Sequence, residues 1–220
     1  MALLPNTETT ETSARAMTRP FFVRLALLLS LSACTGTPLE VPLTYQPGAA
    51  GSSGTTATAS PAATAAPLVA VAEVRAPPNQ TELGTVSGPL GLHPHPLRSD
   101  LPPQQAIRNV AEGALMARGL LAPAGAQHFD LDLQIRRLHA EQAAGGEAEA
   151  DFLITLKRHG SGDVVYSRET KALKRDSSLY TIDTLGFAPT AGLSALLQQS
   201  ATEAVTKALD DPAFRAALQG

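Results

Sequence analysis

The second half of the chain alternates apolar and polar positions with the two-residue period of a β-strand. In FDLDLQIRRLHAE, which begins at Phe129, the odd-numbered side chains through Ile135 are apolar and those between them are polar. Because successive side chains of a strand point to opposite faces, the pattern predicts a strand with one buried face. The phase slips at RRL, residues 136–138, where we expect a bulge or the end of the strand.

The same period predicts three further strands. ADFLITLKRHG, residues 150–160, alternates through Phe152, Ile154 and Leu156, and the glycines of HGSGD favour a turn into VVYSRETKALKRD, residues 164–176. These two segments are expected to form an antiparallel hairpin. Earlier in the chain, LVAVAEV, residues 68–74, is typical of a first strand. ELGTVSG, residues 82–88, indicates a short ribbon within a loop rich in Pro and Gly.

Apolar residues at helical spacing predict two helices. The first follows Asp100, a candidate capping residue, with Pro102 and Pro103 in its first turn and Gly119 as its stop. The second is expected to start at Thr190, and a short final turn follows Pro212. The expected buried positions are Ile107, Val110, Ala111, Ala114 and Leu115 in the first helix, and Leu193, Leu196, Leu197, Ala201, Ala204, Val205 and Ala208 in the second.

The order strand, helix, three strands, helix predicts an α+β fold. We expect a small mixed or antiparallel sheet with both helices on one face, the face that bears Phe129, Leu133, Ile154 and Leu156. The first strand and the strand after the first helix are expected to lie parallel.

The amino-terminal segment has a different pattern, which indicates an export signal over residues 1–33. A basic stretch ending at Arg24 precedes a short apolar run, Leu25 to Ala33, and Met17 is an alternative start. The run is shorter than the roughly 20 apolar residues that cross a bilayer. The predicted cleavage lies between Ala33 and Cys34, which is the only cysteine of the chain.

The residues around this cysteine, Leu31-Ser32-Ala33-Cys34, resemble the lipobox of bacterial lipoproteins. The resemblance implies that Cys34 becomes the first residue and carries fatty acyl chains such as palmitate. Several acyl chains on one residue exceed what stable membrane anchoring requires, since each buried CH₂ contributes about 0.8 kcal/mol. For a Gram-negative source, Thr35 in place of an aspartate implies the outer membrane, with the domain in the periplasm.

The composition of the rest of the chain indicates two regions, residues 34–66 and residues 67–220. Residues 34–66 are expected to be the lipidated cysteine and a flexible tether, because PGAAGSSGTTATASPAATAAP is almost wholly Pro, Ala, Gly, Ser and Thr. Residues 67–220 are expected to be a single domain. One cysteine cannot form an intramolecular disulfide, so the domain must be stabilised by its packed core.

Charge argues against nucleic acid as a partner. The whole chain carries a formal net charge of −3, and the expected signal contains more basic than acidic residues, so the mature chain is more acidic still. Binding to a phosphate backbone needs an excess of Lys and Arg.

The segments ALMARGLLAP and FDLDLQIRRLHAE, followed by the hairpin and a closing helix that ends near Asp210 and Asp211, resemble the YajG-like family of bacterial outer-membrane lipoproteins. The resemblance covers roughly residues 68–218 together with the lipobox. It implies a fold and a location but no chemistry, since the family is largely uncharacterised.

No pattern in the sequence indicates a catalytic site, a cofactor or a metal centre. His93 and His95 in HPHP lack the third and fourth ligands that a metal site needs. GLSAL around Ser194 falls in a helix pattern rather than a strand-to-helix turn, and GSGDVV at Gly160 joins two strands, unlike a nucleotide-binding loop. Asp130 and Asp132 are explained by a solvated strand face.

The face of the predicted sheet opposite the helices is the candidate partner surface. It is expected to show Gln134, Arg136, Leu153, Thr155 and Lys157, although simple hydration of such a face is the alternative. We therefore hypothesise a non-enzymatic, lipid-anchored module that binds an envelope protein or glycan through this face or through an edge strand. A carrier of a small apolar or amphipathic ligand is the alternative, and an enzyme of unknown class is the third option.

Overall fold

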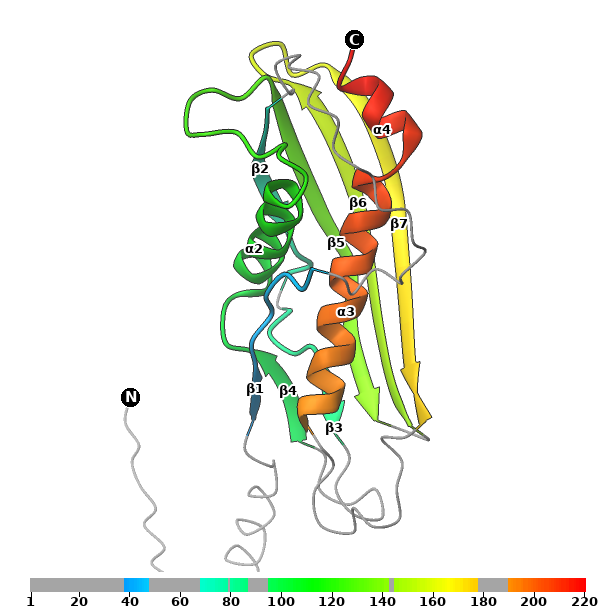
Figure 1. The fold of residues 1–220 in the computed structure, drawn as a ribbon. Helices are drawn as coiled ribbons and strands as arrows, with labels where there is room; N and C mark the ends of the chain where they lie inside the picture. The colour runs from blue at the N-terminus through cyan, green and yellow to red at the C-terminus, as the bar shows by residue number, and fades with distance from the viewer. Residues whose placement is uncertain (1–37, 48–67, 79, 87–94, 143–144, 178–189) are drawn as a thin grey trace, which may run out of the picture. The chain divides into compact units, whose positions relative to one another are not determined.

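The structure is a computed structural model that describes residues 38–47, 68–78, 80–86, 95–142, 145–177 and 190–220. All of them belong to one compact unit, Thr35–Gly220 (Figure 1). The expected signal and its cleavage site lie outside the described residues. In the part of the chain that is described, no helix has the length and apolarity needed to span a membrane.

Within the described residues, seven strands form a single mixed sheet. Their bounds are β1 Leu39–Val41, β2 Val69–Arg75, β3 Gly84–Val86, β4 His95–Ser99, β5 Phe129–Gln142, β6 Gly146–Arg158 and β7 Val164–Asp176. Strands β5, β6 and β7 pair antiparallel, and β2 lies parallel to the first half of β5. The last part of β5 pairs with β3 instead of β2. From β3 the sheet continues to β4 and then to β1. The predicted α+β fold class and the parallel pairing of β2 with β5 are confirmed.

The phase slip at RRL is a β-bulge. The β5–β6 register shifts between Ile135 and Arg137, so Arg136 is the extra residue. The strand does not end there, and β5 continues to Gln142. Because the bulge adds one residue, Leu138 and Ala140, which follow it in β5, are again buried.

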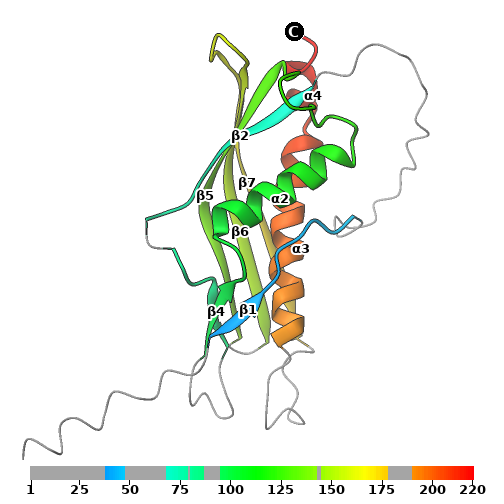
Figure 2. The same ribbon diagram turned by 90° about the vertical axis from the view of Figure 1, so that its left-hand side faces the viewer.

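Two long helices cover one face of the sheet, which we call the inner face (Figures 1 and 2). They are α2, Pro103–Met116, and α3, Thr190–Leu209, and a short α4, Pro212–Ala217, follows α3. Every position expected to be buried in α2 and α3 is buried. Gly119, with φ of 66°, follows the last turn of α2 as predicted.

The predicted capping role of Asp100 is wrong. The residue before α2 is Pro102, and no side chain caps this end. The carbonyl of Pro102 instead accepts from the amides of Gln105 and Ala106, at 2.8 and 3.0 Å. Because Pro103 has no amide hydrogen, the first turn has one donor fewer to satisfy.

The tether was predicted to extend through residues that in fact pack on the domain. Leu39–Val41 forms β1, and Val41 and Leu43 are 1% and 2% exposed. The segment PLEVPLTY, residues 38–45, alternates apolar and polar side chains as a strand does, and the low-complexity stretch after it obscured that signal. Residues 48–66 lie outside the described residues.

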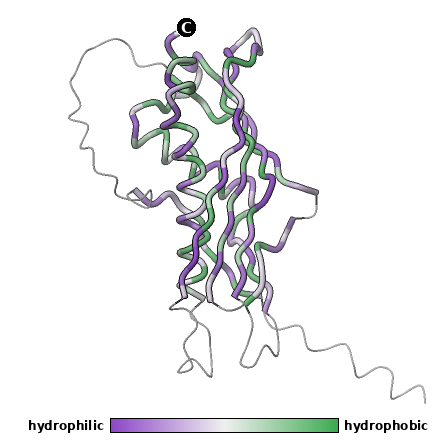
Figure 3. The backbone as a smooth tube through the Cα atoms, turned by 90° about the vertical axis from the view of Figure 1, so that its right-hand side faces the viewer, coloured by the Kyte–Doolittle hydropathy of each residue, from purple (hydrophilic) through white to green (hydrophobic). Residues whose placement is uncertain are grey.

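The core lies between the inner face and the two helices. Leu131, Leu133, Phe152, Ile154 and Leu156 are at most 1% exposed, and Figure 3 shows the alternation of apolar and polar residues along the strands. Opposite them, α3 presents both leucines and small side chains such as Ala201 and Ala204, and the small ones allow a helix to lie close to a sheet. The opposite face of β5, β6 and β7, which we call the outer face, is not covered by any described helix (Figure 2).

Candidate interaction surface

The outer face carries the side chains that alternate with the buried ones along β5 and β6. Gln134, Leu153, Thr155 and Lys157 alternate with fully buried inner-face residues, so they all lie on the outer face, and each is half-buried by its neighbours. Arg136 is exposed at the bulge. The structure therefore brings four of the five predicted partner-face residues onto one side of the sheet, and the fifth, Arg136, is the unpaired residue of the bulge.

Within this face, Leu153 sits between Gln134 of β5 and Glu169 of β7 in the strand register. The neighbouring Thr155 lies within 3.3 Å of the hydroxyl of Ser167, oxygen to oxygen. Leu173 of β7 adds a second apolar side chain and is 41% exposed. Two leucines thus stand among polar neighbours, and Val164, the register partner of Lys157, is a further exposed apolar side chain at 58%.

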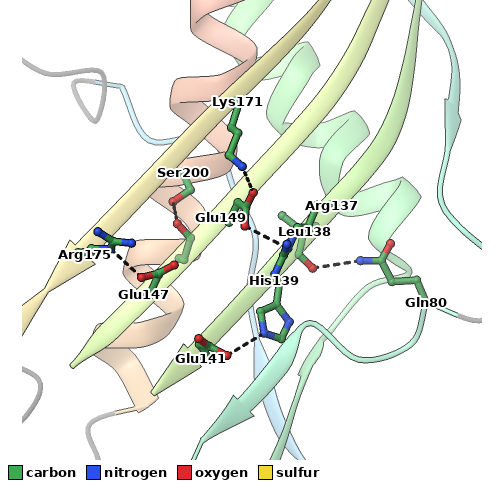
Figure 4. A network of polar contacts seen from close by, with 11 residues as sticks. Gln80, Arg137, Leu138, His139, Glu141, Glu147, Glu149, Lys171, Arg175 and Ser200 are labelled. Atoms are coloured by element: carbon green, nitrogen blue, oxygen red, sulfur yellow. Dashed lines mark hydrogen bonds and ion pairs between the residues drawn. The ribbon is translucent and has the colours of Figure 1, made fainter. Parts of the chain in front are cut away.

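An ion-pair cluster that the sequence reading missed surrounds Glu149 (Figure 4). Its carboxylate binds Arg137 Nε at 3.1 Å from β5 and Lys171 Nζ from β7, so three strands are joined through one side chain. Glu149 is only 8% exposed. The hydrogen bond from Lys171, supported by the charges of Arg137 and Lys171, outweighs burial and lowers the pKa of Glu149.

Two residues further along β6, Asp151 shows the opposite behaviour. Its register partners are Arg137 and Lys171, but both of these bind Glu149 instead. Asp151 Oδ1 is buried without a hydrogen-bond partner. Burial, followed by the nearby negative charge of Glu169, raises the pKa of Asp151. The outer face therefore holds two neighbouring carboxylates with opposite behaviour. The charged form of Glu149 is favoured by its basic partners, and the charged form of Asp151 is disfavoured by burial.

The other half of the outer face is also lined with paired charges. Lys157 Nζ binds Asp132 Oδ2 at 2.6 Å, and His159 Nδ1 lies 2.9 Å from Asp130 Oδ2. These pairs agree with the prediction that Asp130 and Asp132 lie on a solvated strand face. Partly exposed pairs of this kind contribute little to stability, roughly 0–1 kcal/mol each, but they fix where charge is displayed.

The residues considered for other chemistry lie apart from this face or outside the described residues. His93 is among the latter, and His95 opens β4. Within the described ranges, no group of three or more His, Cys, Asp or Glu is placed to hold a metal ion. Ser194 lies inside α3, where its hydroxyl donates to the carbonyl of Ala191 at 2.8 Å. Gly160 and Gly162 form the predicted β6–β7 turn, with φ of 85° and 75°.

A hollow of about 320 Å³ lies where β5 and β7 end and β6 begins. Its lining includes Glu141, Glu147, Arg175 and Asp176, and Arg175 Nε donates to Glu147 Oε2 at 2.7 Å. Four of its seven lining residues are charged and none has a large apolar side chain, and the hollow lies at the end of the sheet rather than between sheet and helices. A carrier of an apolar ligand would need an apolar cavity, so the hollow does not favour that hypothesis.

The arrangement was compared with known proteins. No protein-family model matches the sequence, and no curated protein matches it significantly. Among solved structures, protein XCC0632 from Xanthomonas campestris, of the DUF330 family, superposes with a TM-score of 0.52 at 16% identity, over 82% of this chain and 95% of its own. The two chains share a fold.

Two further structures overlap less completely. A candidate lipoprotein from Caulobacter crescentus has a TM-score of 0.40 at 16% identity, over 63% of this chain and 91% of its own. The hypothetical protein CT253 from Chlamydia trachomatis has a TM-score of 0.39 at 13% identity, over 65% of this chain and 95% of its own.

Proposed function

We propose that this protein is a lipid-anchored, non-enzymatic binding module of the bacterial envelope, which holds an envelope protein or glycan through the outer face of its sheet. The observation that carries the proposal is the asymmetry of the sheet. Both long helices cover the inner face, whereas the outer face of β5, β6 and β7 stays uncovered by any described helix and displays Leu153 and Leu173 among fixed charges.

The anchor is proposed from the sequence. A short apolar run, a lipobox-like LSAC and a single cysteine at its end support acylation of Cys34 and retention at a membrane, with the outer membrane as the expected one. The resemblance to the YajG-like lipoproteins supports the same location.

The outer face is favoured over the edge of the sheet as the binding surface. β7 is an edge strand, and its basic side chains are already paired: Arg168 with Asp211, Lys174 with Glu203, and Arg175 with Glu147. Lys207 Nζ also donates to the backbone carbonyl of Lys171 at 3.0 Å. Charged side chains along an edge are typical of strands protected against pairing with another chain.

The proposal is tested by charging the centre of the outer face. In Leu153→Glu/Thr155→Lys, recovery of the crosslinked envelope partner should fall at least tenfold, because a buried charge at an interface is costly. The matched control is Met116→Glu on α2, which alters a side chain that is 66% exposed on the helical layer and should leave recovery unchanged. Equal recovery from both variants, with unfolding midpoints like that of the wild type, would exclude the outer face.

A further inference from the structure

The segment that follows Cys34 belongs to the folded domain. Leu39, Glu40 and Val41 pair in parallel with Leu97, Arg98 and Ser99 of β4. The carbonyl of Val41 accepts from the amide of Asp100 at 3.2 Å. The first strand of the sheet therefore begins five residues after Cys34.

The next residues fasten this segment to both helices. Gln198 of α3 donates through Nε2 to Thr44 Oγ1 at 2.7 Å and accepts from Gln46 Nε2 at 3.0 Å. On α2, a Cβ added to Gly113 would lie 2.6 Å from the Cβ of Tyr45, so the absence of a side chain at Gly113 lets Tyr45 pack there. Residues 39–46 are thus held by the sheet and by the helical layer.

The strand register shows at which end of the sheet the chain enters. Leu39 lies in one row across six strands, and the residues of that row are Leu39, Leu97, Gly84, Ala140, Ala148 and Lys174. Because β1 is parallel to β4, the chain before Leu39 continues toward His95, whose partner is Val86. That direction leads to the end of β5 at Gln142, the start of β6 at Gly146 and the end of β7 at Asp176, which we together call the entry end.

Chain length limits how far Cys34 can be from this end. Five Cα–Cα steps join Cys34 to Leu39, and an extended chain covers at most about 3.6 Å per residue, or roughly 18 Å. The Ala/Thr/Pro-rich stretch, residues 48–66, starts and returns on the domain, so it adds nothing to this distance. By contrast, the 13 residues of β7 span roughly 40 Å from the entry end to the β6–β7 turn, His159–Asp163.

We infer that the protein is held on a short link with its entry end toward the bilayer and its β6–β7 turn directed away. This inference rests on the proposed acylation of Cys34. The partner of the entry end is a lipid surface. The strands then stand away from the membrane, which leaves the outer face open to the side along its whole length. Residues 48–66 come after the first strand in the sequence, so they are not the link to the membrane.

The test uses the acylated protein in vesicles that carry an acceptor dye on their lipid headgroups. Once Cys34 is acylated, Ser177→Cys at the entry end or Ser161→Cys in the β6–β7 turn provides the single free thiol for a donor dye; both positions are exposed. Energy transfer to the membrane should be at least severalfold higher from position 177 than from position 161.

Two matched insertions identify the link. A Gly/Ser stretch of about 20 residues has a root-mean-square reach of about 25 Å. Inserted between Thr37 and Pro38 it should lower transfer from position 177 severalfold, whereas the same insertion after Thr56 should leave transfer unchanged. Equal effects of the two insertions, or equal transfer from positions 161 and 177, would overturn the orientation.

The acylation state of Cys34 distinguishes a failure of the proposed orientation from a failure of the proposed function. Mass spectrometry of the amino-terminal peptide reports whether Cys34 carries acyl chains. An unmodified Cys34 in protein that fails to bind vesicles would overturn the anchor itself. Acylated protein in which both insertions act alike would overturn the orientation and leave the anchored binding module in place.

Discussion

The two faces of the sheet are made by the same three strands but are stabilised by different physics. On the inner face, Phe152 and its neighbours belong to a buried apolar cluster that also includes residues of α2 and α3, and burial is nearly complete. On the outer face, half-buried polar side chains are held by ion pairs that span β5, β6 and β7. The inner face therefore determines stability, and the outer face determines what the domain presents to its surroundings.

The largest expected difference comes from two adjacent residues of β6. Phe152→Ala removes a side chain with 0% exposure from the inner face and should lower the free energy of unfolding by about 3–5 kcal/mol. Leu153→Ala, one residue further and on the outer face, should lower it by no more than about 1 kcal/mol. Urea unfolding of the two variants measures both values, and similar losses would contradict the assignment of the faces.

A smaller effect is expected where the amino-terminal segment meets the helical layer. Gln198→Ala should cost about 1–3 kcal/mol, because the side chain is 8% exposed and exchanges hydrogen bonds with Thr44 and Gln46. Hydrogen exchange should show faster opening of residues 39–46 in this variant, with β5 and β6 unchanged. Protection of residues 39–46 equal to that of the wild type would show that Gln198 does not hold the segment.

On the outer face, Glu149→Gln should destabilise the protein by about 1 kcal/mol at neutral pH. The pKa of Glu149 is lowered by folding, so its contribution is complete above the ordinary glutamate value and is lost as the pH falls through the lower folded value. The difference in unfolding free energy between wild type and variant should therefore shrink on acidification. A difference that stays constant down to acidic pH would argue against the Arg137–Glu149–Lys171 cluster.

The smallest effect is expected at Asp151, with the opposite sign. Folding raises the pKa of Asp151, so its charged form costs stability above the folded value. Asp151→Asn should increase the free energy of unfolding at neutral pH by up to about 0.5 kcal/mol. This gain should disappear below the ordinary aspartate value, where the carboxyl is protonated in both states. A loss of stability at neutral pH would show that Asp151 has a favourable partner.

The local pattern predicted much of this comparison. Strict alternation in residues 129–135 and 152–157 identified both faces of β5 and β6, and helical spacing identified the buried side of α3. The cluster at Glu149 could not be predicted, because it depends on the register of β7 against β6, which is set by contacts between distant parts of the chain. For the same reason, the pairing of Leu39–Val41 with β4 was missed.

The most direct test of the account is site-specific photocrosslinking in cells that make the acylated protein. A photoreactive side chain at Thr155, on the outer face, is compared with the same group at Met116, on α2. The account predicts a discrete crosslinked envelope component from position 155, absent from position 116 and lost when Leu153 is changed to Glu. Crosslinks from position 116 alone, or identical products from both positions, would contradict the outer face as the binding surface.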